Sequence, residues 1–199
     1  NQCVCITGST HGIGYGIADA FAKNGAKIVI NSHEQDNGAI DKLSQWSECY
    51  FVQSDLSTID GNKKLIKEAN IKLGKIDTLI NNAGTFQDTD FESINEENFN
   101  KTFNLNVRGY MFTSQEFVKQ ISTNQKNTSI ICIGSSNSLA AEKNSVMYDT
   151  SKGAVLMMIK SMAISLASKN IRVNGIGPGI LETPLTSEGL NKGNNKKVI

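Results

Sequence analysis

Two motifs in this sequence combine residue types that could bind and convert a ligand. The first is a glycine-containing turn between an apolar, strand-like run and a helix-like stretch, with the sequence Thr7-Gly8-Ser9-Thr10-His11-Gly12-Ile13-Gly14. Residues without side chains at such a turn let backbone N–H groups and the positive end of the helix approach a pyrophosphate closely. The glycines therefore favour a dinucleotide-binding turn over a purely structural tight turn.

The second motif places Lys152 four residues after Tyr148 on a predicted helix. Side chains at positions i and i+4 share one helix face, so the ammonium lies near the phenol. The spacing alone would also suit a solvated surface pair. However, Ser135 follows a predicted strand, at the carboxyl edge where open α/β sheets bind ligands. Because a free tyrosine has a pKa of about 10, it needs a nearby cation to act as a base at neutral pH.

The elements that must position these residues alternate along the chain. Short, continuous apolar runs predict strands at residues 3–7, 27–31, 49–53, 76–81, 129–133 and 171–176. Helical periodicity predicts helices at residues 14–24, 39–46, 60–73, 95–123 and 146–168. This alternation is typical of repeated βαβ units. We expect an α/β fold with a doubly wound, Rossmann-like parallel sheet in a single domain, residues 1–199.

Composition and charge exclude several classes of protein. The chain has 199 residues, 39% of them hydrophobic and 20% charged, with a formal charge of +1. That composition is typical of an ordinary globular domain, and it lacks the charge excess that nucleic acid or an anionic membrane requires. No apolar run is long enough to span a bilayer, and residues 1–10 lack the layout of a signal peptide. We expect a cytoplasmic protein with no nucleic-acid or membrane partner.

The four cysteines lie in strand-like apolar segments, at Cys3, Cys5, Cys49 and Cys132. This placement predicts buried free thiols. Cys3 and Cys5 could form a Cys-x-Cys metal pair, but no second pair of ligands follows. No metal site is predicted.

These features together resemble the short-chain dehydrogenase/reductase family over essentially the whole chain. The turn from Thr7 to Gly14 matches the family's Thr-Gly-x-x-x-Gly-x-Gly pattern. Further matches follow in the family's order: Asp55-Leu56 at the adenine, Asn81-Asn82-Ala83-Gly84 after the fourth strand, Asn106, Ser135, Tyr148 with Lys152, and Pro178-Gly179 with Thr183 at the nicotinamide.

The resemblance implies an NAD(P)(H)-dependent oxidoreductase that interconverts a carbonyl and a secondary alcohol of a small molecule. Tyr148 is then the general acid, Lys152 supports it and binds the nicotinamide ribose, Ser135 holds the substrate oxygen, and Asn106 anchors a water in the proton relay. A 3-oxoacyl thioester is one substrate class that the analogy suggests. The alternative is a catalytically silent nucleotide-binding or subunit-assembly relative.

The resemblance also bears on the choice of cofactor. Ser32 stands where an acidic residue binds the ribose 2′-OH in NAD-dependent members, and His33 and His11 stand where NADP-dependent members often carry a basic residue. We therefore expect NADP(H) to be favoured over NAD(H). Glu34 leaves the other choice open, because a small shift of the turn would bring its carboxylate to the ribose.

Two more expectations concern assembly and chain length. Members of the family are commonly homotetramers or homodimers, so we expect a homo-oligomer. They also usually continue through a seventh strand, which is missing from this chain. We expect the sequence to be C-terminally incomplete, with residues 184–199 in the substrate lid.

Overall fold

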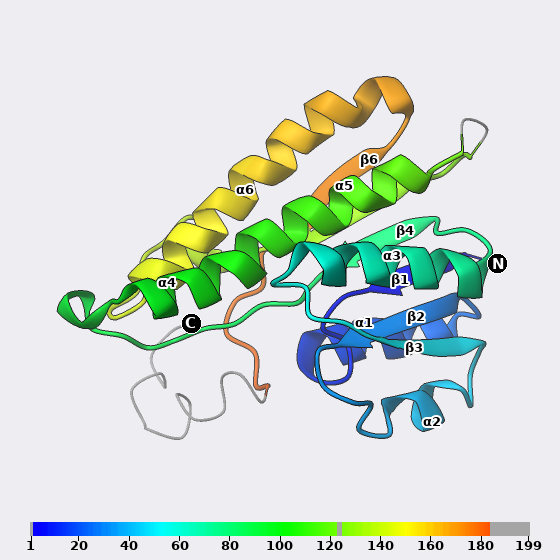
Figure 1. Ribbon diagram of the computed structural model, residues 1–199, viewed down its shortest axis with the longest axis horizontal. Helices are drawn as coiled ribbons and strands as arrows, with labels where there is room; N and C mark the ends of the chain where they lie inside the picture. The colour runs from blue at the N-terminus through cyan, green and yellow to red at the C-terminus, as the bar shows by residue number, and fades with distance from the viewer. Residues whose placement is uncertain (1, 123–124, 184–199) are drawn as a thin grey trace.

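The computed structural model describes residues 2–122 and 125–183 of the chain. In this part, six parallel strands form one sheet in the order β3-β2-β1-β4-β5-β6 (Figure 1). They are β1 (Cys3–Ile6), β2 (Lys27–Ser32), β3 (Cys49–Gln53), β4 (Thr78–Asn81), β5 (Ser129–Ile133) and β6 (Arg172–Ile176). All six predicted strands are confirmed. The lid expected at residues 184–199 lies outside the described residues.

The order of the strands reverses direction at β1, which lies between β2 and β4. The chain leaves β1 and β4 at the same edge of the sheet but continues toward opposite sides, and such a switch point opens a crevice for ligands. All four residues of β1 are buried. A strand covered on both faces has a continuous apolar sequence, which explains why β1 could be predicted from the sequence.

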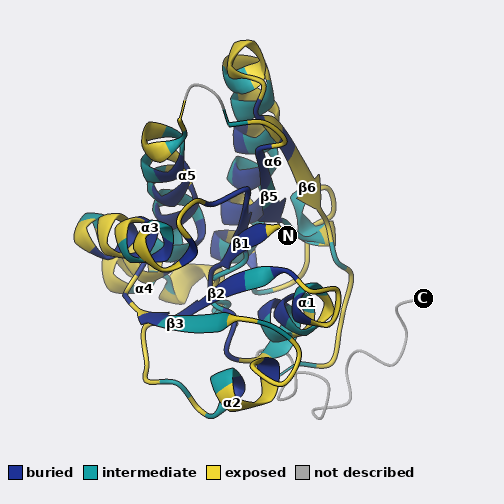
Figure 2. Cartoon of the chain, turned by 90° about the vertical axis from the view of Figure 1, so that its right-hand side faces the viewer, coloured by how far each residue is buried: buried dark blue, intermediate teal, exposed yellow. Residues whose placement is uncertain are grey.

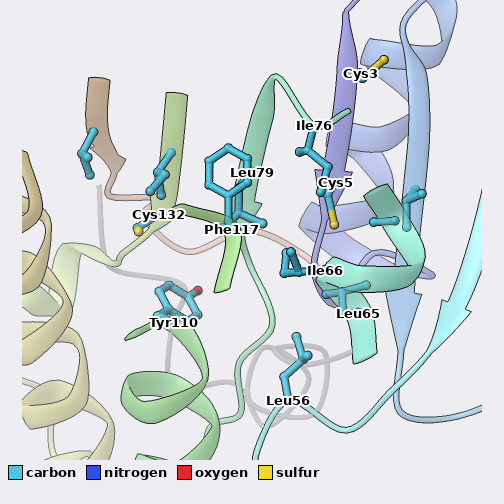
Figure 3. Close-up of a cluster of buried hydrophobic side chains, with 14 of the residues drawn as sticks. Cys3, Cys5, Leu56, Leu65, Ile66, Ile76, Leu79, Tyr110, Phe117 and Cys132 are labelled. Carbon is cyan, nitrogen blue, oxygen red and sulfur yellow. The ribbon is translucent and has the colours of Figure 1, made fainter. Parts of the chain in front are cut away.

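Helices cover both faces of the sheet (Figure 2). On one face, α1 (Gly12–Lys23) and α2 (Ala39–Leu43) pack on apolar side chains of β1 and β2. On the other face lie α3 (Ile59–Leu73), α5 (Tyr110–Gln120) and α6 (Val146–Leu166), which enclose the larger cluster in Figure 3. The doubly wound fold is therefore confirmed. Among the described residues, every helix is too short or too polar to cross a lipid bilayer.

The structure corrects the long helix predicted at residues 95–123. That stretch contains α4 (Glu96–Phe103), a π-helical segment η2 (Asn104–Gly109) and α5, which ends at Gln120. The predicted helix at 39–46 is also shorter, ending at Leu43. Single-turn 3₁₀ segments complete the described elements: η1 (Phe91–Ser93), η3 (Ser136–Ser138) and η4 (Ala167–Lys169). Apolar periodicity does not reveal the π-helical segment, because such segments are rare and too short to leave a pattern of their own.

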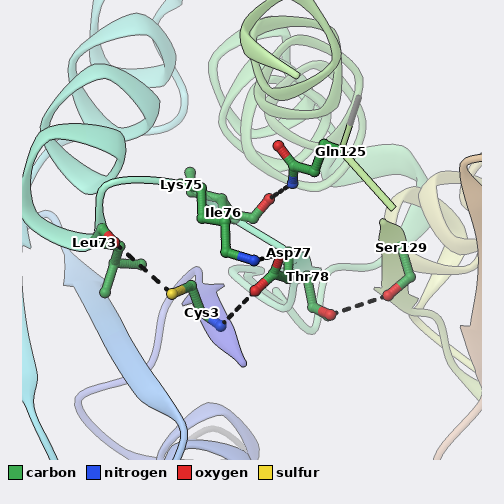
Figure 4. Close-up of polar contacts among 8 residues, drawn as sticks. All are labelled: Cys3, Leu73, Lys75, Ile76, Asp77, Thr78, Gln125 and Ser129. Atoms are coloured by element: carbon green, nitrogen blue, oxygen red, sulfur yellow. Dashed lines mark hydrogen bonds and ion pairs between the residues drawn. The ribbon is translucent and has the colours of Figure 1, made fainter. Parts of the chain in front are cut away.

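Polar contacts hold the amino-terminal edge of the sheet, opposite the switch-point crevice (Figure 4). The buried carboxylate of Asp77 accepts hydrogen bonds from the Cys3 backbone N at 2.9 Å and from Lys75 Nζ at 2.7 Å. The hydroxyls of Thr78 and Ser129 lie 3.0 Å apart and join β4 to β5. These contacts hold β1, β4 and β5 together beneath the site.

The cysteine thiols are free, as predicted. Cys3, Cys5 and Cys132 are buried, whereas Cys49 is half-buried. Burial raises the pKa of Cys5 to about 12 and that of Cys132 to about 11. Both thiols therefore stay protonated and serve as packing groups at neutral pH.

Candidate active site

The glycine turn folds against the end of β4, and its shape depends on missing side chains. Gly8 and Gly12 both have φ of +57°. A Cβ on Gly8 would lie 2.7 Å from the Ala83 Cα, and one on Gly14 would lie 2.3 Å from the Gly8 carbonyl oxygen. In the described structure α1 begins here without a side-chain cap, so its first N–H groups stay available to a ligand.

Residues after β4 brace this turn from behind. The Thr7 hydroxyl accepts hydrogen bonds from the backbone N of Asn82 and Ala83, at 2.8 and 2.9 Å. The Asn82 side chain donates to the carbonyl oxygens of Thr7 and Gly8, at 2.9 and 2.7 Å. The Asn-Asn-Ala-Gly segment thus holds the turn in the conformation that its glycines permit.

Asn31 is a second brace, which the sequence analysis missed. It ends the buried part of β2, and its Oδ1 accepts a hydrogen bond from the Gly8 backbone N at 3.3 Å. Its Nδ2 donates to the carbonyl oxygens of Val52 and Ser54, each at 3.1 Å. Asn31 therefore joins the ends of β1, β2 and β3. A buried amide at the end of an apolar strand was the signal that could have revealed it.

We expect replacement of Gly14 by alanine to disrupt both folding and cofactor binding. The new Cβ would lie 2.3 Å from the Gly8 oxygen and 2.4 Å from Asn82 Nδ2. Such overpacking costs about 1–3 kcal/mol, and displacement of the turn should weaken nicotinamide-cofactor binding by roughly tenfold or more. Thermal melting and a fluorescence titration with NADPH measure the two effects.

Gly16→Ala is the matched control, because a Cβ at that position of α1 meets no atom within 4 Å. An alanine there should stabilise the helix by about 0.5–1 kcal/mol and leave cofactor binding unchanged. Equal cofactor affinity of the Gly14→Ala variant and the parent would contradict the assigned role of the turn.

One cavity of about 610 Å³ extends from this turn to the carboxyl ends of β4 and β5. Most of the predicted site residues border it: Gly8, Thr10, His11, Gly12, Ile13, Ser32, His33, Asp55, Leu56, Asn82, Ala83, Gly84, Ser135, Tyr148, Lys152, Pro178, Gly179 and Thr183. Three others, Ser9, Gly14 and Asn106, are buried behind the cavity wall. Their expected roles at the cofactor and in the proton relay stay predictions.

Ser135, Tyr148 and Lys152 meet at one end of this cavity. Ser135 follows β5, whereas Tyr148 and Lys152 lie in the first turns of α6. The Lys152 Nζ lies 5.6 Å from the centre of the Tyr148 ring and donates a hydrogen bond to the Ile133 carbonyl oxygen at 2.9 Å. The predicted clustering of the three side chains is therefore present in the structure.

Burial shifts the pKa values of Tyr148 and Lys152 in the directions that favour the neutral side chains. Burial raises the pKa of Tyr148 above its ordinary value, and the charges of Asp149 and Glu142 raise it further, while a hydrogen bond with Ser135 opposes them. Burial also lowers the pKa of Lys152 to about 8. At neutral pH the phenol thus carries its proton and the lysine is largely an ammonium.

The ring of Tyr148 is oriented by a residue that the sequence analysis did not select. Phe86 packs edge-on against it, with ring centres 5.3 Å apart and an interplanar angle of 88°. Tyr110 is another residue that the sequence analysis did not select. Its hydroxyl donates a hydrogen bond at 3.0 Å to the Ile133 carbonyl oxygen, which also accepts from Lys152. Neither belongs to a motif, so only the tertiary structure reveals them.

Asn106 connects the loop after β4 with α6. Its Oδ1 accepts a hydrogen bond from the Thr85 backbone N at 2.8 Å. Its Nδ2 donates to the Thr85 carbonyl oxygen at 2.9 Å and to the Ser151 hydroxyl at 3.0 Å. The side chain braces the wall beside Lys152, and its expected part in a proton relay stays a prediction.

Comparison with known proteins agrees with this geometry. The sequence profile described as short chain dehydrogenase matches residues 2–193. The NADP-dependent (R)-specific alcohol dehydrogenase of Lentilactobacillus kefiri is 33% identical over 187 residues, which is 92% of this chain and 74% of that protein. The 3-oxoacyl-(acyl-carrier-protein) reductase of Thermotoga maritima is 32% identical over 191 residues, 93% of this chain and 76% of that protein.

A solved structure supports the same assignment. The 3-oxoacyl-(acyl-carrier protein) reductase from Brucella melitensis, in complex with NAD, superposes with a TM-score of 0.91 at 29% identity, over 96% of this chain and 78% of that one. Profile, sequence and structure thus point to one family. The chain belongs to the short chain dehydrogenase family of NAD(P)-dependent oxidoreductases.

Proposed function

We propose that this protein reduces a ketone to a secondary alcohol with NADPH, and that 3-oxoacyl thioesters are its substrate class. The observation that carries the proposal is the single cavity that the glycine turn shares with Ser135, Tyr148 and Lys152. A site of this kind brings a hydride donor and a proton donor to the same carbonyl group.

The residues present fit a dinucleotide along this cavity. The glycine turn and the start of α1 would hold the pyrophosphate, because α1 begins at Gly12 without a side-chain cap and leaves its first N–H groups available. Asp55 and Leu56 would border the adenine, and Pro178 and Gly179 the nicotinamide. When bound, the reduced cofactor supplies the hydride.

Three side chains would take part in protonating the carbonyl oxygen of the substrate. Tyr148 gives its proton to that oxygen as negative charge develops there, and its raised pKa keeps the phenol protonated until then. Ser135 donates a hydrogen bond to the same oxygen. The ammonium of Lys152, held by the Ile133 carbonyl, stabilises the phenolate that remains.

The comparisons favour catalysis over the silent relative. Two of the relatives described above are 3-oxoacyl-(acyl-carrier-protein) reductases, which supports this substrate class. The alcohol dehydrogenase relative supports small ketones as the second candidate. The test is to mix the protein with NADPH and either an acetoacetyl thioester or a panel of small ketones, and to follow cofactor absorbance. Cofactor binding without turnover of any carbonyl compound would instead support the silent relative.

We also infer that NADPH is preferred over NADH. Ser32, His33 and His11 border the cavity. The Ser32 hydroxyl accepts a hydrogen bond from the Glu34 backbone N at 3.1 Å, and this bond holds the turn. The Glu34 side chain is 78% exposed and lies beside His33, outside the residues that border the cavity. A 2′-phosphate at this end would therefore meet two imidazoles and a hydroxyl.

Ser32→Asp should reverse the preference, because a carboxylate there repels a 2′-phosphate and binds a ribose 2′-OH. We expect kcat/KM with NADPH to fall roughly tenfold or more, while kcat/KM with NADH is maintained or rises. Glu34→Ala is the comparison: it removes a carboxylate 3.8 Å from His33 Nε2, so kcat/KM with NADPH should stay the same or rise. A parent protein with the higher kcat/KM for NADH would contradict the inferred preference.

We propose further that the protein forms a homo-oligomer in the cytoplasm. Several apolar side chains stand exposed on α4, α5 and α6, including Phe99, Met111, Met157 and Ile164. Exposed apolar side chains on these helices support a subunit interface.

A further inference from the structure

The carboxylate of Asp149, next to the candidate proton donor Tyr148, accepts hydrogen bonds on both oxygens from the loop that carries Ser135. Asp149 follows Tyr148 in α6, and its Oδ1 accepts hydrogen bonds from Asn137 Nδ2 and from the Ser145 hydroxyl, each at 2.7 Å. Its Oδ2 accepts one from the Glu142 backbone N at 3.0 Å. All three donors belong to residues 134–145, which join β5 to α6.

The carboxylate determines how the Asn137 amide is oriented. A carboxylate accepts hydrogen bonds and donates none, so the amide must turn its Nδ2 toward Asp149. Its Oδ1 then faces the hydroxyls of Ser135 and Ser136, at 3.4 and 3.3 Å, and can only accept from them. Asp149 thereby sets the direction of both hydrogen bonds: Ser135 donates to Asn137, and Asn137 donates to Asp149.

Asn137 also constrains Ser135 through its backbone. The Asn137 backbone N donates to the Ser135 Oγ at 3.1 Å, so this hydroxyl accepts from one group of Asn137 and donates to another. The donated bond is long at 3.4 Å, and long hydrogen bonds are weak. The hydroxyl can therefore exchange it for a bond to a substrate oxygen at little cost.

From these contacts we propose that Asp149 is a positioning residue, which acts through Asn137 to hold the Ser135 hydroxyl beside Tyr148. The proposal rests on the proposed function, because it matters to catalysis only if Ser135 binds the substrate oxygen. It predicts a loss of kcat without a loss of cofactor affinity when the Asp149–Asn137 pair is broken, since neither residue borders the cofactor cavity.

The test exchanges the two side chains. Asn137→Asp alone sets one carboxylate against another, and we expect kcat to fall roughly tenfold to hundredfold, with the Kd for NADPH unchanged. Adding Asp149→Asn restores an amide facing a carboxylate. In the double variant the amide can donate to position 137 and to Ser145 and still accept from the Glu142 backbone. We expect this variant to recover most of the lost kcat.

Charge alone is controlled by Glu142→Gln. The charges of Asp149 and Glu142 both raise the pKa of Tyr148, but the Glu142 side chain is exposed and takes no part in the Asp149–Asn137 pair. This variant should keep the parent kcat, with at most a small shift of the alkaline limb of the pH profile toward lower pH. Because Asn137→Asp adds a negative charge and Glu142→Gln removes one, a rise of kcat in Glu142→Gln as large as the fall in Asn137→Asp would show that charge, and not position, is responsible.

Asn137→Ala keeps the test decisive if Asn137→Asp fails to fold, because it leaves the Ser145 and Glu142 contacts of Asp149 in place. Its melting temperature should stay close to that of the parent while kcat falls. Parent-like kcat in folded Asn137→Ala, or no recovery in the folded double variant, would overturn the proposal. An inactive parent protein would instead overturn the proposed function, so the two failures are distinguishable.

Discussion

Tyr148→Phe is expected to lower kcat for carbonyl reduction by about 10²–10⁴-fold and to leave the Kd for NADPH nearly unchanged. The substitution keeps the aromatic ring, which packs edge-on against Phe86 at 5.3 Å. It removes only the hydroxyl, and with it the proton that the developing alkoxide needs. Steady-state kinetics and a cofactor titration measure the two quantities separately.

Tyr50→Phe provides a matched control. Tyr50 lies in β3, and its hydroxyl donates to the Glu48 carboxylate on the protein surface, away from the cavity. The control should keep the kinetics of the parent. If Tyr148→Phe also kept the parent kcat, the proton would come from another group and the assignment of Tyr148 would be wrong.

Lys152→Met is expected to abolish turnover and, at the same time, to make the folded protein more stable. Burial lowers the pKa of Lys152 to about 8, from an ordinary value of 10.5. A difference of that size means that the buried ammonium costs on the order of 3 kcal/mol at neutral pH. Methionine removes this cost but loses the hydrogen bond to the Ile133 carbonyl, so the net gain should be about 1–3 kcal/mol.

The pH dependence of stability gives this prediction a second readout. Below pH 8 both the folded and the unfolded protein carry the lysine proton, and the full penalty applies. Between pH 8 and 10.5 the unfolded chain binds more protons than the folded one, so this group makes the free energy of unfolding rise with pH. In Lys152→Met this contribution is absent, and the stability difference between the two proteins should shrink across that range.

Denaturant-induced unfolding at neutral and alkaline pH measures the change in stability, and turnover assays measure the loss of activity. Lys160→Met is the control, because Lys160 is exposed on the same helix. It should change neither stability nor turnover by a measurable amount. A Lys152→Met protein less stable than the parent at neutral pH would show that the lysine contributes more through its contacts than it loses through burial.

Local sequence patterns were sufficient to predict the sheet. The residues of β1, Cys3 to Ile6, are buried and apolar throughout, as expected for a strand covered on both faces. The glycine turn was recognisable for a similar reason, because few residue types other than glycine fit a backbone with φ of +57°. In both cases the physical constraint acts within a few consecutive residues.

The interruption of the long helix at 95–123 was not predictable in this way. The π-helical segment at Asn104–Gly109 brings Asn106 against Thr85 and Ser151, which come from other parts of the chain. The segment, Asn-Leu-Asn-Val-Arg-Gly, contains no proline, and its one glycine stands at its end. Its geometry depends on contacts with α6 and with the loop that follows β4. Those contacts exist only once these two parts of the chain have packed together.

The sequence by itself determined the fold class, and it predicted the glycine turn and Ser135, Tyr148 and Lys152 as candidate site residues. Only the tertiary structure decided that burial keeps the Tyr148 phenol protonated, that Asn31 braces the turn and that Asp149 reaches Ser135 through Asn137. The physical reason is that desolvation and hydrogen-bond partners depend on what surrounds a side chain in space. Those surroundings come from strand ends and loops far apart in the sequence, and packing around the switch point brings them together.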